Sequence, residues 1–417
     1  MGSSLWTAVS GLYASSKQMD VIGNNIANVN TVGFKAGVPV FSDILSQSIA
    51  GGSGSMQIGR GVGLSAIPTL FGQGSFESTQ SATDLAIDGD GFFMVNDADG
   101  ATYYTRAGMF TIDKDGCLVD ANSHKVQGYL YEDGVFTDTV GDIALGGVQS
   151  VPEVTTRISI GTNLDGETVQ DDTFVSALTV FDSLGAAHTL SMTFTKIATD
   201  GGGWNITGSM SGLEPIDGLT LSPATITFDA TGKLLEATTD IDITVTGDMA
   251  GGATIGETGV IRWDLVDGDV DGDGKDAEVM TGYASPSVNR ALESDGHSSG
   301  ELQSLSVASD GVLNGFFSNG QTADIGQIAL AKFANPWGLN KMGSNLFAST
   351  TNSGDALINK PGTAGLGEIN PNSLEMANTD IATEFINMIT AQRAYQANAK
   401  VITTTDTMMS DLMNIKR

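Results

Sequence analysis

Glycine and proline are distributed unevenly along the 417 residues of this chain. Residues 375–417 contain neither, whereas residues 36–374 hold 50 of the 54 glycines. A segment without helix breakers permits one unbroken helix. The middle instead alternates turn residues with short β-rich runs at 91–95, 177–181 and 241–245, a pattern typical of antiparallel strands. We therefore predict a mixed, mainly β fold that ends in a long helix.

Apolar residues recur with alternating spacings of four and three at both ends of the chain. The C-terminal stripe follows Asp380, a residue type suited to an N-cap, and comprises Ile381, Phe385, Met388, Tyr395, Ala399, Ile402, Met409 and Met413, with Gln392 and Asp406 at its polar positions. The N-terminal segment repeats the rhythm at Leu5, Val9, Leu12, Met19 and Ile26. This heptad spacing favours two long helices that pair as a coiled coil.

The alternative is that each amphipathic helix packs on its own domain. The β-rich middle leaves no obvious place for a helix of about 35 residues to dock, since its strands are expected to fill their own cores. Small side chains crowd both terminal segments, as at Ala8, Gly11, Ala14, Ala391 and Ala394. Because small residues allow close approach on more than one side, we expect the helix pair to pack against further copies of itself.

The charge is concentrated between the two ends. The chain has 19 Lys and Arg against 49 Asp and Glu, a net charge of −30, whereas residues 1–35 and 375–417 together are neutral. Such an acidic chain repels phosphate backbones and anionic lipids, which disfavours nucleic-acid binding and membrane-surface binding. No apolar run approaches the roughly 20 residues that cross a bilayer, so membrane insertion is not expected.

Cysteine and the N-terminus restrict the redox chemistry and the export route. A single cysteine, Cys117, excludes an intramolecular disulfide and a cysteine-based zinc site. The first residues have neither a basic n-region nor a clean apolar h-region, so they do not form an ordinary secretory signal. The chain is therefore expected to be cytoplasmic or exported without a cleaved peptide.

Two motifs at the chain ends are similar to those of the bacterial flagellar rod and hook proteins. At the N-terminus these are residues 8–12 (AVSGL) and 23–35 (GNNIANVNTVGFK), and at the C-terminus residues 374–380 (LEMANTD) and 391–400 (AQRAYQANAK). The asparagines and glycines of the first motif tolerate left-handed backbone, which indicates a helix that ends in a side-chain-bonded turn.

The resemblance continues through the body. Residues 84–93 (DLAIDGDGFF), 105–110 (TRAGMF), 317–321 (FSNGQ) and 333–339 (FANPWGL) look like the family's inner-domain strands. Residues 180–188 (VFDSLGAAH) and Trp204 are similar to the outer β domain of its hook members. The implied organisation is an N-terminal helix at 1–33, a connector at 34–79, an inner β domain at 80–145 with 285–374, an outer β domain at 146–284 and a C-terminal helix at 375–417.

The resemblance implies a non-enzymatic structural subunit of the flagellar hook, outside the cell. Such subunits form a hollow, bendable tube, with the helices along its inner wall, that transmits motor torque from rod to filament. The implied partners are further copies of the chain, the distal rod, hook-cap and hook–filament junction proteins, and the flagellar export apparatus. We expect the assembly interface to comprise Leu5, Val9, Leu12, Met19, Asn24, Asn25, Ile26, Asn28, Phe34, Ile381, Phe385, Met388, Gln392, Arg393, Tyr395, Ala399 and Ile402.

Residues 267–278 form an acidic loop that resembles a calcium-binding EF-hand loop in its spacing. Carboxylates occupy positions 1, 3, 5, 7 and 12 of the loop, with glycine at position 6, and these residues are Asp267, Asp269, Asp271, Asp273 and Glu278. Gly274 and Lys275 depart from the motif, and a strand-like segment replaces the entering helix. The loop is therefore interpreted either as a calcium site, which makes calcium the one candidate cofactor, or as a solvated acidic hairpin tip.

A catalytic role has little support. The three histidines, His124, His188 and His297, are far apart in sequence and show no metal-pair spacing, and the chain has no nucleophile-elbow motif. Two further functions are consistent with part of the sequence. One is a distal rod or hook-associated axial protein, and the other is a calcium-dependent extracellular β adhesin, which would leave the paired terminal motifs unexplained.

Overall fold

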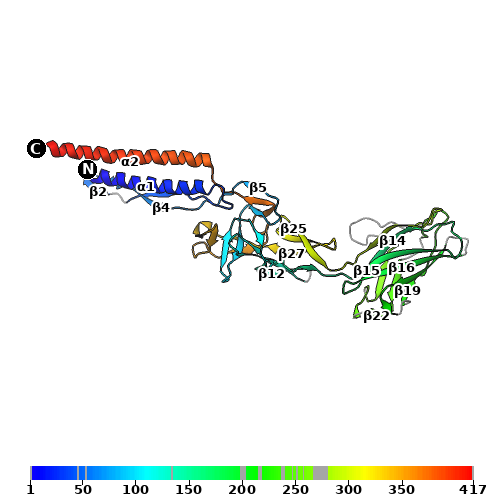
Figure 1. Ribbon diagram of the computed structural model, residues 1–417. Helices are drawn as coiled ribbons and strands as arrows, with labels where there is room; N and C mark the ends of the chain where they lie inside the picture. The colour runs from blue at the N-terminus through cyan, green and yellow to red at the C-terminus, as the bar shows by residue number, and fades with distance from the viewer. Residues whose placement is uncertain are drawn as a thin grey trace. The chain divides into compact units, whose positions relative to one another are not determined.

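The computed structural model describes residues 2–44, 47–51, 54–132, 135–197, 203–214, 218–235, 240–246, 248–249, 252–256, 258–265 and 280–415. The chain divides into two compact units. Unit 1 comprises Met1–Val148, Ser304–Gly315 and Ala323–Arg417, and unit 2 comprises Gln149–Gln303 and Phe316–Thr322. The described part is mainly β, with one long helix near each end, as the sequence predicts (Figure 1).

The two long helices are α1 (Gly2–Ala27) and α2 (Ile381–Ile415), both in unit 1. Asp380 is the N-cap of α2, because its carboxylate accepts hydrogen bonds from the Ala382 N–H at 3.0 Å and the Thr383 hydroxyl at 2.6 Å. After α1, the Asn28 side chain donates to the Asn24 carbonyl at 2.9 Å. The asparagine-rich motif thus ends α1 in the side-chain-bonded turn that the sequence indicates.

The large sheet of unit 1 has the strand order β26-β27-β11-β7-β8-β30-β29. These strands are β26 (Val312–Phe317), β27 (Thr322–Ile328), β11 (Lys125–Glu132), β7 (Phe92–Asn96), β8 (Thr102–Thr105), β30 (Leu346–Ala348) and β29 (Asn340–Gly343). It is extended by β9 (Thr111–Ile112), β10 (Leu118–Val119), β12 (Val135–Asp142), β28 (Leu330–Lys332) and β31 (Leu357–Asn359). In unit 2, β13 (Gln149–Ser150) pairs with the first residues of β25 (Gly300–Val307). A 3₁₀ helix, η2 (Pro336–Gly338), precedes β29.

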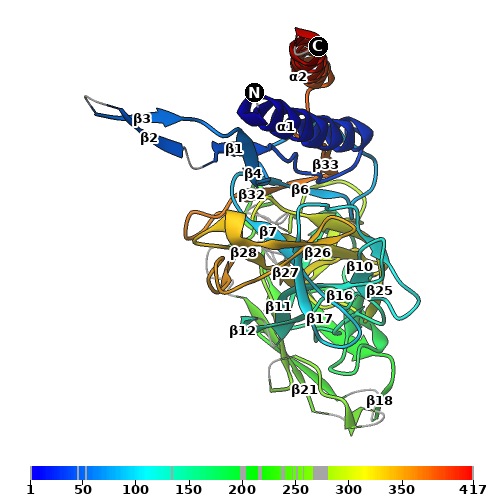
Figure 2. The same ribbon diagram turned by 90° about the vertical axis from the view of Figure 1, so that its left-hand side faces the viewer.

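Four two-stranded sheets are formed by residues that lie, in sequence, between the long helices and the strands of the large sheet. The segment expected as a connector forms β1 (Val40–Asp43) with β4 (Val62–Ala66), and β2 (Gln47–Gly51) with β3 (Gly54–Ile58). Strands from the two halves of unit 1 then pair, β5 (Phe76–Ser78) with β33 (Ser373–Glu375) and β6 (Leu85–Asp88) with β32 (Glu368–Pro371). The described connector is therefore strand-rich, with β1, β2, β3 and β4 visible beside α1 (Figure 2). Its strand β5 pairs with β33, the start of the C-terminal motif.

Unit 2 contains two larger sheets and a short strand pair. The five-stranded sheet has the order β19 (Leu219–Ser222), β21 (Ile241–Val245), β23 (Val260–Trp263), β14 (Arg157–Asn163) and β24 (Val288–Ser294). The four-stranded sheet has the order β15 (Thr173–Phe181), β16 (Ala187–Lys196), β17 (Trp204–Met210) and β20 (Thr225–Ile226), and the short pair is β18 (Leu213–Glu214) with β22 (Asp248–Met249).

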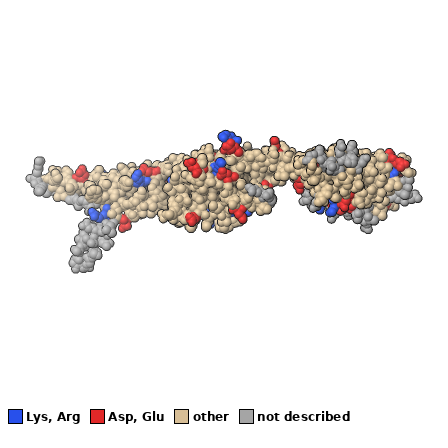
Figure 3. Space-filling view, turned by 90° about the horizontal axis from the view of Figure 1, so that it is seen from below, with Lys and Arg blue, Asp and Glu red and all other residues tan. Residues whose placement is uncertain are grey.

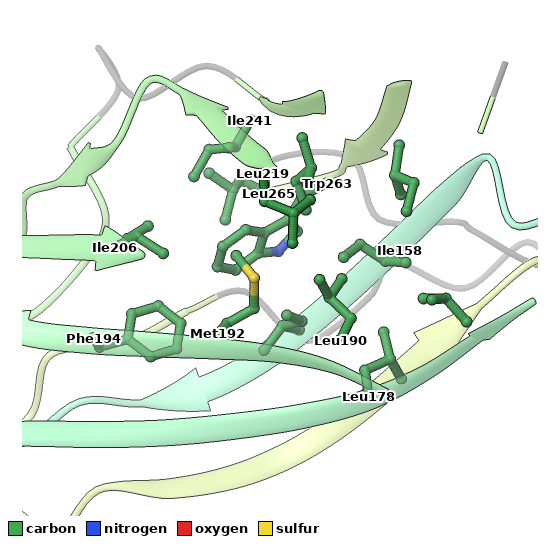
Figure 4. Packing of buried hydrophobic residues seen from close by; sticks show 14 of the residues in the cluster. Ile158, Leu178, Leu190, Met192, Phe194, Ile206, Leu219, Ile241, Trp263 and Leu265 are labelled. Atoms are coloured by element: carbon green, nitrogen blue, oxygen red, sulfur yellow. The ribbon is translucent and has the colours of Figure 1, made fainter. Parts of the chain in front are cut away.

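The core of unit 2 lies between these sheets. Alternate residues of β15 and β16 are buried, so each strand presents one face inward. Phe194 packs edge to face on Trp263, with ring centroids 6.0 Å apart (Figure 4). Unit 1 has its own aromatic cluster, which includes Phe92, Tyr104 and Phe333. Each unit therefore has a hydrophobic core of its own.

Asp182 organises the turn between β15 and β16. Its buried carboxylate accepts hydrogen bonds from the Leu184 and Ala186 N–H groups at 2.9 and 2.8 Å, and lies 3.0 Å from Nε2 of His188. Burial acts to raise the pKa of Asp182, but the hydrogen bonds from His188, Ala186 and Leu184 outweigh it and hold the pKa of this carboxyl below its usual range. The ionised form is thus favoured in the folded state.

We expect Asp182→Asn to reduce the acid sensitivity of unit 2. A carboxyl whose folded pKa lies below its unfolded pKa stabilises the fold above about pH 4, and this contribution is lost as the pH falls through the folded value. Urea unfolding at several pH values, followed by the fluorescence of the buried Trp204 and Trp263, measures the effect. An equally steep loss of stability on acidification in wild type and variant would contradict the assignment.

Charged side chains do not gather into one extended patch on the face shown in Figure 3. Asp and Glu appear there in small, separated groups with occasional Lys and Arg between them. Neither of the long helices, within the residues that the structure describes, is long and apolar enough to span a membrane.

Candidate assembly surface

The helices α1 and α2 run antiparallel and contact each other. The Asn25 side-chain amide donates to Glu384 Oε1 at 3.1 Å near one end of the pair, while Gly11 faces Asn398 further along. A Cβ built on Gly11 would lie 2.6 Å from Nδ2 of Asn398, closer than side chains pack. A larger residue at this position would therefore have to displace the Asn398 side chain.

Most residues that the helices bury are small or polar, with Ile22 as the large apolar exception. The small and polar ones are Ala8, Ala14, Ser15 and Asn25 of α1, and Ala391 and Thr405 of α2. Part of the apolar stripes predicted from the sequence faces solvent in the single chain, since Leu5, Val9, Ile381, Phe385 and Tyr395 are all exposed. Small side chains allow a shorter distance between the helix axes, which explains why this face forms the contact within one chain.

Some of the remaining residues of the expected interface are half-buried and others are exposed to solvent. Leu12, Met19, Ile26, Met388, Ala399 and Ile402 are half-buried, and Gln392 and Arg393 are exposed. The exposed apolar surface includes Met409 and Met413 of the predicted stripe and is larger than the sequence predicted, because Trp6 and Tyr13 of α1 and Ile386, Ile389, Val401, Met408 and Leu412 of α2 also belong to it. We call the exposed apolar residues of α1 and α2 the helix surface; exposed apolar patches of this kind mark sites of protein contact.

The asparagines of the N-terminal motif bond mainly within the chain. Asn25 is buried, and its amide exchanges two hydrogen bonds with the Gly37 backbone, at 2.9 and 3.1 Å. Within the single chain, Asn25 thus joins α1 to the segment before β1. Asn24 and Asn28 shape the turn after α1, and Phe34 lies half-buried with the Lys341 ammonium 5.7 Å from its ring centre.

A buried cluster of three charged residues fixes the terminal segments to the β body. Oε1 of Glu375 lies 2.6 Å from the Lys35 ammonium, and its Oε2 lies 3.3 Å from Nη1 of Arg106. The three side chains are between 0 and 4% exposed. The Glu375 carboxylate also accepts a hydrogen bond from the Gly74 N–H at 2.9 Å. We call these three residues the junction cluster.

The junction cluster contains two cations and one anion. Backbone carbonyls also accept from the cations, since Lys35 donates to the Gly72 oxygen at 2.9 Å and Arg106 to the Gly89 oxygen at 2.8 Å, while Nε of Arg106 is buried without a hydrogen-bond partner. Burial lowers the pKa of Lys35 and of Arg106, and the Glu375 carboxylate opposes that shift in both. The carboxylate is thus the group that makes burial of both cations tolerable.

Neighbouring hydrogen bonds link the same three segments. The Asn378 side chain accepts from the Ala36 N–H at 2.8 Å and donates to the Leu70 and Gly72 carbonyls. The Gly33 N–H donates to the Glu375 carbonyl at 2.7 Å, and Gly33 has φ +68° in a place where a Cβ would overlap the Arg106–Ala107 backbone. The N-terminal motif, the 105–110 motif and the C-terminal motif therefore meet at one site.

The expected metal loop lies outside the described residues. Asp267, Asp269, Asp271, Asp273 and Glu278 all fall within 266–279, which the structure does not describe. Among the residues that it does describe, no group of three or more His, Cys, Asp or Glu side chains is arranged to hold a metal ion.

Family models match successive parts of the chain. They are the flagella basal body rod protein at 5–35, the flagellar hook protein FlgE/F/G D1 domain at 86–177, the flagellar basal body protein FlaE D2 domain at 153–297 and the flagellar basal body rod FlgEFG protein C-terminal model at 370–415. The chain is also 36% identical, over 449 aligned residues and 99% of both chains, to flagellar hook protein FlgE of Borreliella burgdorferi. This chain belongs to the flagellar hook protein FlgE family.

Two more FlgE relatives have similar lengths. The FlgE of Treponema pallidum is 32% identical, with 99% of each chain covered, and that of Escherichia coli is 32% identical, with 98% of this chain and 99% of the relative covered. The crystal structure of Helicobacter pylori flagellar hook protein FlgE2 aligns with a TM-score of 0.45 and 12% identity, over 72% of this chain and all of the other. A likeness at that level carries no argument.

The junction cluster is the feature of this FlgE-family chain that the sequence analysis missed. Lys35, Arg106 and Glu375 each stand inside a motif that the family resemblance singled out. Their combination was not apparent, because 340 residues separate Lys35 from Glu375 and charged residues are usually solvated. The available signal was the single charged residue of the 23–35 motif and of the 105–110 motif, together with Glu375, which precedes the helix cap Asp380 in the 374–380 motif.

Proposed function

We propose that this chain is a structural subunit of the flagellar hook that polymerises through α1 and α2 into a hollow, bendable tube, which transmits torque from rod to filament. The helix surface is the observation that carries this proposal. It presents many large apolar side chains on two helices that lie against each other within the chain. Burying these side chains against other copies would remove them from water at about 25 cal/mol for each Å².

The junction cluster supports the same role. A hook subunit must pass force between its helices and its β body without unfolding where they join. The segments 33–37, 72–75, 105–107 and 375–378 are connected there by buried ion pairs and backbone hydrogen bonds. A junction of this kind resists local opening more than a solvated linker would.

The remaining parts of the proposal follow from membership of the family. The terminal helices would act as a coiled coil within the polymer, the inner β domain would be 80–145 with 285–374, and the outer β domain 146–284. The partners would be further copies of the chain, the distal rod, hook-cap and hook–filament junction proteins, and the export apparatus. The full-length similarity to FlgE proteins favours the hook over a distal rod or an adhesin, and no catalytic step forms part of the proposal.

Electron microscopy of the purified full chain tests this function. We expect wild-type protein to form curved tubes, and a variant that ends at Asp380, and so lacks α2, to remain unpolymerised. Because unit 2 has its own core, the truncated protein should retain a β-type circular dichroism spectrum. Normal tubes from the truncated protein, or none from wild type under any condition that supports hook assembly, would refute the proposal.

Calcium binding by residues 267–278 is a separate proposal. It rests on the spacing of five carboxylates, which repel one another strongly without a cation. Calorimetric titration of the full chain with calcium, beside a variant with Asp267 and Asp269 replaced by Asn, would show whether those carboxylates bind the ion.

A further inference from the structure

Two arginines lie side by side on the five-stranded sheet of unit 2. Arg157 of β14 and Arg262 of β23 are direct partners in the register of these parallel strands. They line a hollow of about 340 Å³ together with Thr156, Asp242, Thr258 and Val260. Like charges that are direct cross-strand partners destabilise a sheet, so this pair carries a local cost.

One described carboxylate lies beside two guanidinium groups, so the pair is only partly neutralised by the residues that the structure describes. Asp242, the one carboxylate among the described residues that line the hollow, is the direct partner of Arg262 in β21 and β23, and its Oδ1 forms an ion pair with Nε of Arg262 at 3.8 Å, beyond hydrogen-bond distance, with both side chains 55% exposed. The nearby Asp295 carboxylate is occupied by the Thr156 hydroxyl and by the backbone N–H groups of Thr156 and Arg157. The Arg157 guanidinium makes no hydrogen bond or ion pair with any described residue.

The opposite end of β14 has the opposite charge. Strand β14 runs from Arg157 to Asn163, about 23 Å for seven residues. The loop that follows, residues 165–172, carries four carboxylates, Asp165, Glu167, Asp171 and Asp172, and no basic residue. Glu167, Asp171 and Asp172 are exposed. One unit thus presents a pair of guanidinium groups at one end of a strand and a group of carboxylates at the other.

We propose that the Arg157–Arg262 pair binds the 165–172 loop of a second copy of this chain, so that successive copies of unit 2 meet end to end in the polymer. This inference rests on the proposed function and identifies a contact outside the helices. An interface between two different patches of identical subunits propagates into a filament without closing. Carboxylates suit the hollow because guanidinium groups bind them through paired, charge-assisted hydrogen bonds.

Charge complementarity favours a second copy as the occupant. In a polymer of chains with a charge of −30, neighbouring acidic units repel each other, and a guanidinium pair that faces a carboxylate loop offsets part of that repulsion. The high local concentration of copies in a polymer also favours this contact over binding of a dilute anion.

A charge swap tests the proposal in the full chain. The critical concentration for polymerisation is measured by sedimentation for wild type, Arg157→Glu, Glu167→Arg and the double variant Arg157→Glu/Glu167→Arg. We expect each single variant to raise the critical concentration roughly tenfold, which corresponds to about 1.4 kcal/mol, and the double variant to return within about threefold of wild type. In about 1 M sodium chloride, where the Debye length is about 3 Å, the differences should disappear.

Arg290→Glu is the matched control, since Arg290 is an exposed arginine of β24 in the same sheet and its change in charge equals that of Arg157→Glu. It should polymerise like wild type, and the Trp fluorescence of each monomer should confirm that unit 2 is folded. The proposal is overturned if Arg157→Glu polymerises like Arg290→Glu, or if Glu167→Arg fails to rescue it. If wild type polymerises while either of these results is obtained, the arginine contact is refuted and the proposed function is not.

Discussion

Replacing Glu375 by glutamine should destabilise unit 1 by roughly 3–5 kcal/mol and weaken polymerisation, because the change removes the anion of a buried ion cluster. Glutamine keeps nearly the same shape and can still accept the Gly74 and Lys35 hydrogen bonds at its side-chain oxygen. The Lys35 and Arg106 cations, almost completely buried, would be left without a counter-charge. The loss would therefore come from electrostatics and not from a cavity.

Urea unfolding of the monomer measures this effect. Because the chain has two units, the unfolding curves from circular dichroism and tryptophan fluorescence should be fitted with a separate transition for each unit. Trp204 and Trp263 report on unit 2, which should unfold as in wild type. Asp115→Asn is the control, because it removes an ion pair with Lys114 that is largely exposed and should cause no measurable change. Unchanged stability of unit 1 in Glu375→Gln would show that the junction cluster is dispensable.

Phe385→Asp should abolish tube formation while it leaves the monomer folded. Phe385 is half exposed on α2, so an aspartate there remains solvated in the single chain. In a polymer that buries this position, the substitution would remove a large apolar contact and would place an unpaired carboxylate in an apolar environment. We expect the critical concentration to rise by roughly 100-fold or more, equivalent to about 2.7 kcal/mol.

Sedimentation and electron microscopy measure polymerisation, and thermal unfolding measures the monomer. Gln396→Asp introduces the same charge at an exposed polar position of α2 and serves as the matched control for helix propensity and net charge. Its critical concentration should stay near that of wild type. If Phe385→Asp assembles as readily as Gln396→Asp, then Phe385 does not belong to a buried interface and the helix surface needs redefinition.

Secondary structure was largely predictable from local pattern. The absence of glycine and proline after residue 375 indicated a long helix, Asp380 was identified as its cap, and α2 begins at Ile381. The runs at 91–95, 177–181 and 241–245 fall in β7, β15 and β21. These features depend on residues close together in sequence, where propensity and hydrogen bonding are local.

The face that each helix turns toward the other was not predictable in the same way. Heptad spacing identified the large residues Leu5, Val9 and Phe385 as the seam, but the chain brings Gly11 and Ala391 into the contact. A helix with apolar residues on more than one side has more than one face that it can bury. Which face is buried within a single chain depends on how closely the two helix backbones approach, and the spacing of apolar residues in the sequence does not give that distance.

The sequence by itself determined that this chain is a mainly β protein with terminal helices, and its end motifs determined its family. Only the tertiary structure decided that Lys35, Arg106 and Glu375 form one buried cluster and that Arg157 and Arg262 are neighbours on a sheet. The physical reason is distance along the chain. Local rules describe residues within a few turns of one another, whereas the pairing of strands and charges separated by a hundred residues or more follows from the packing of the whole unit.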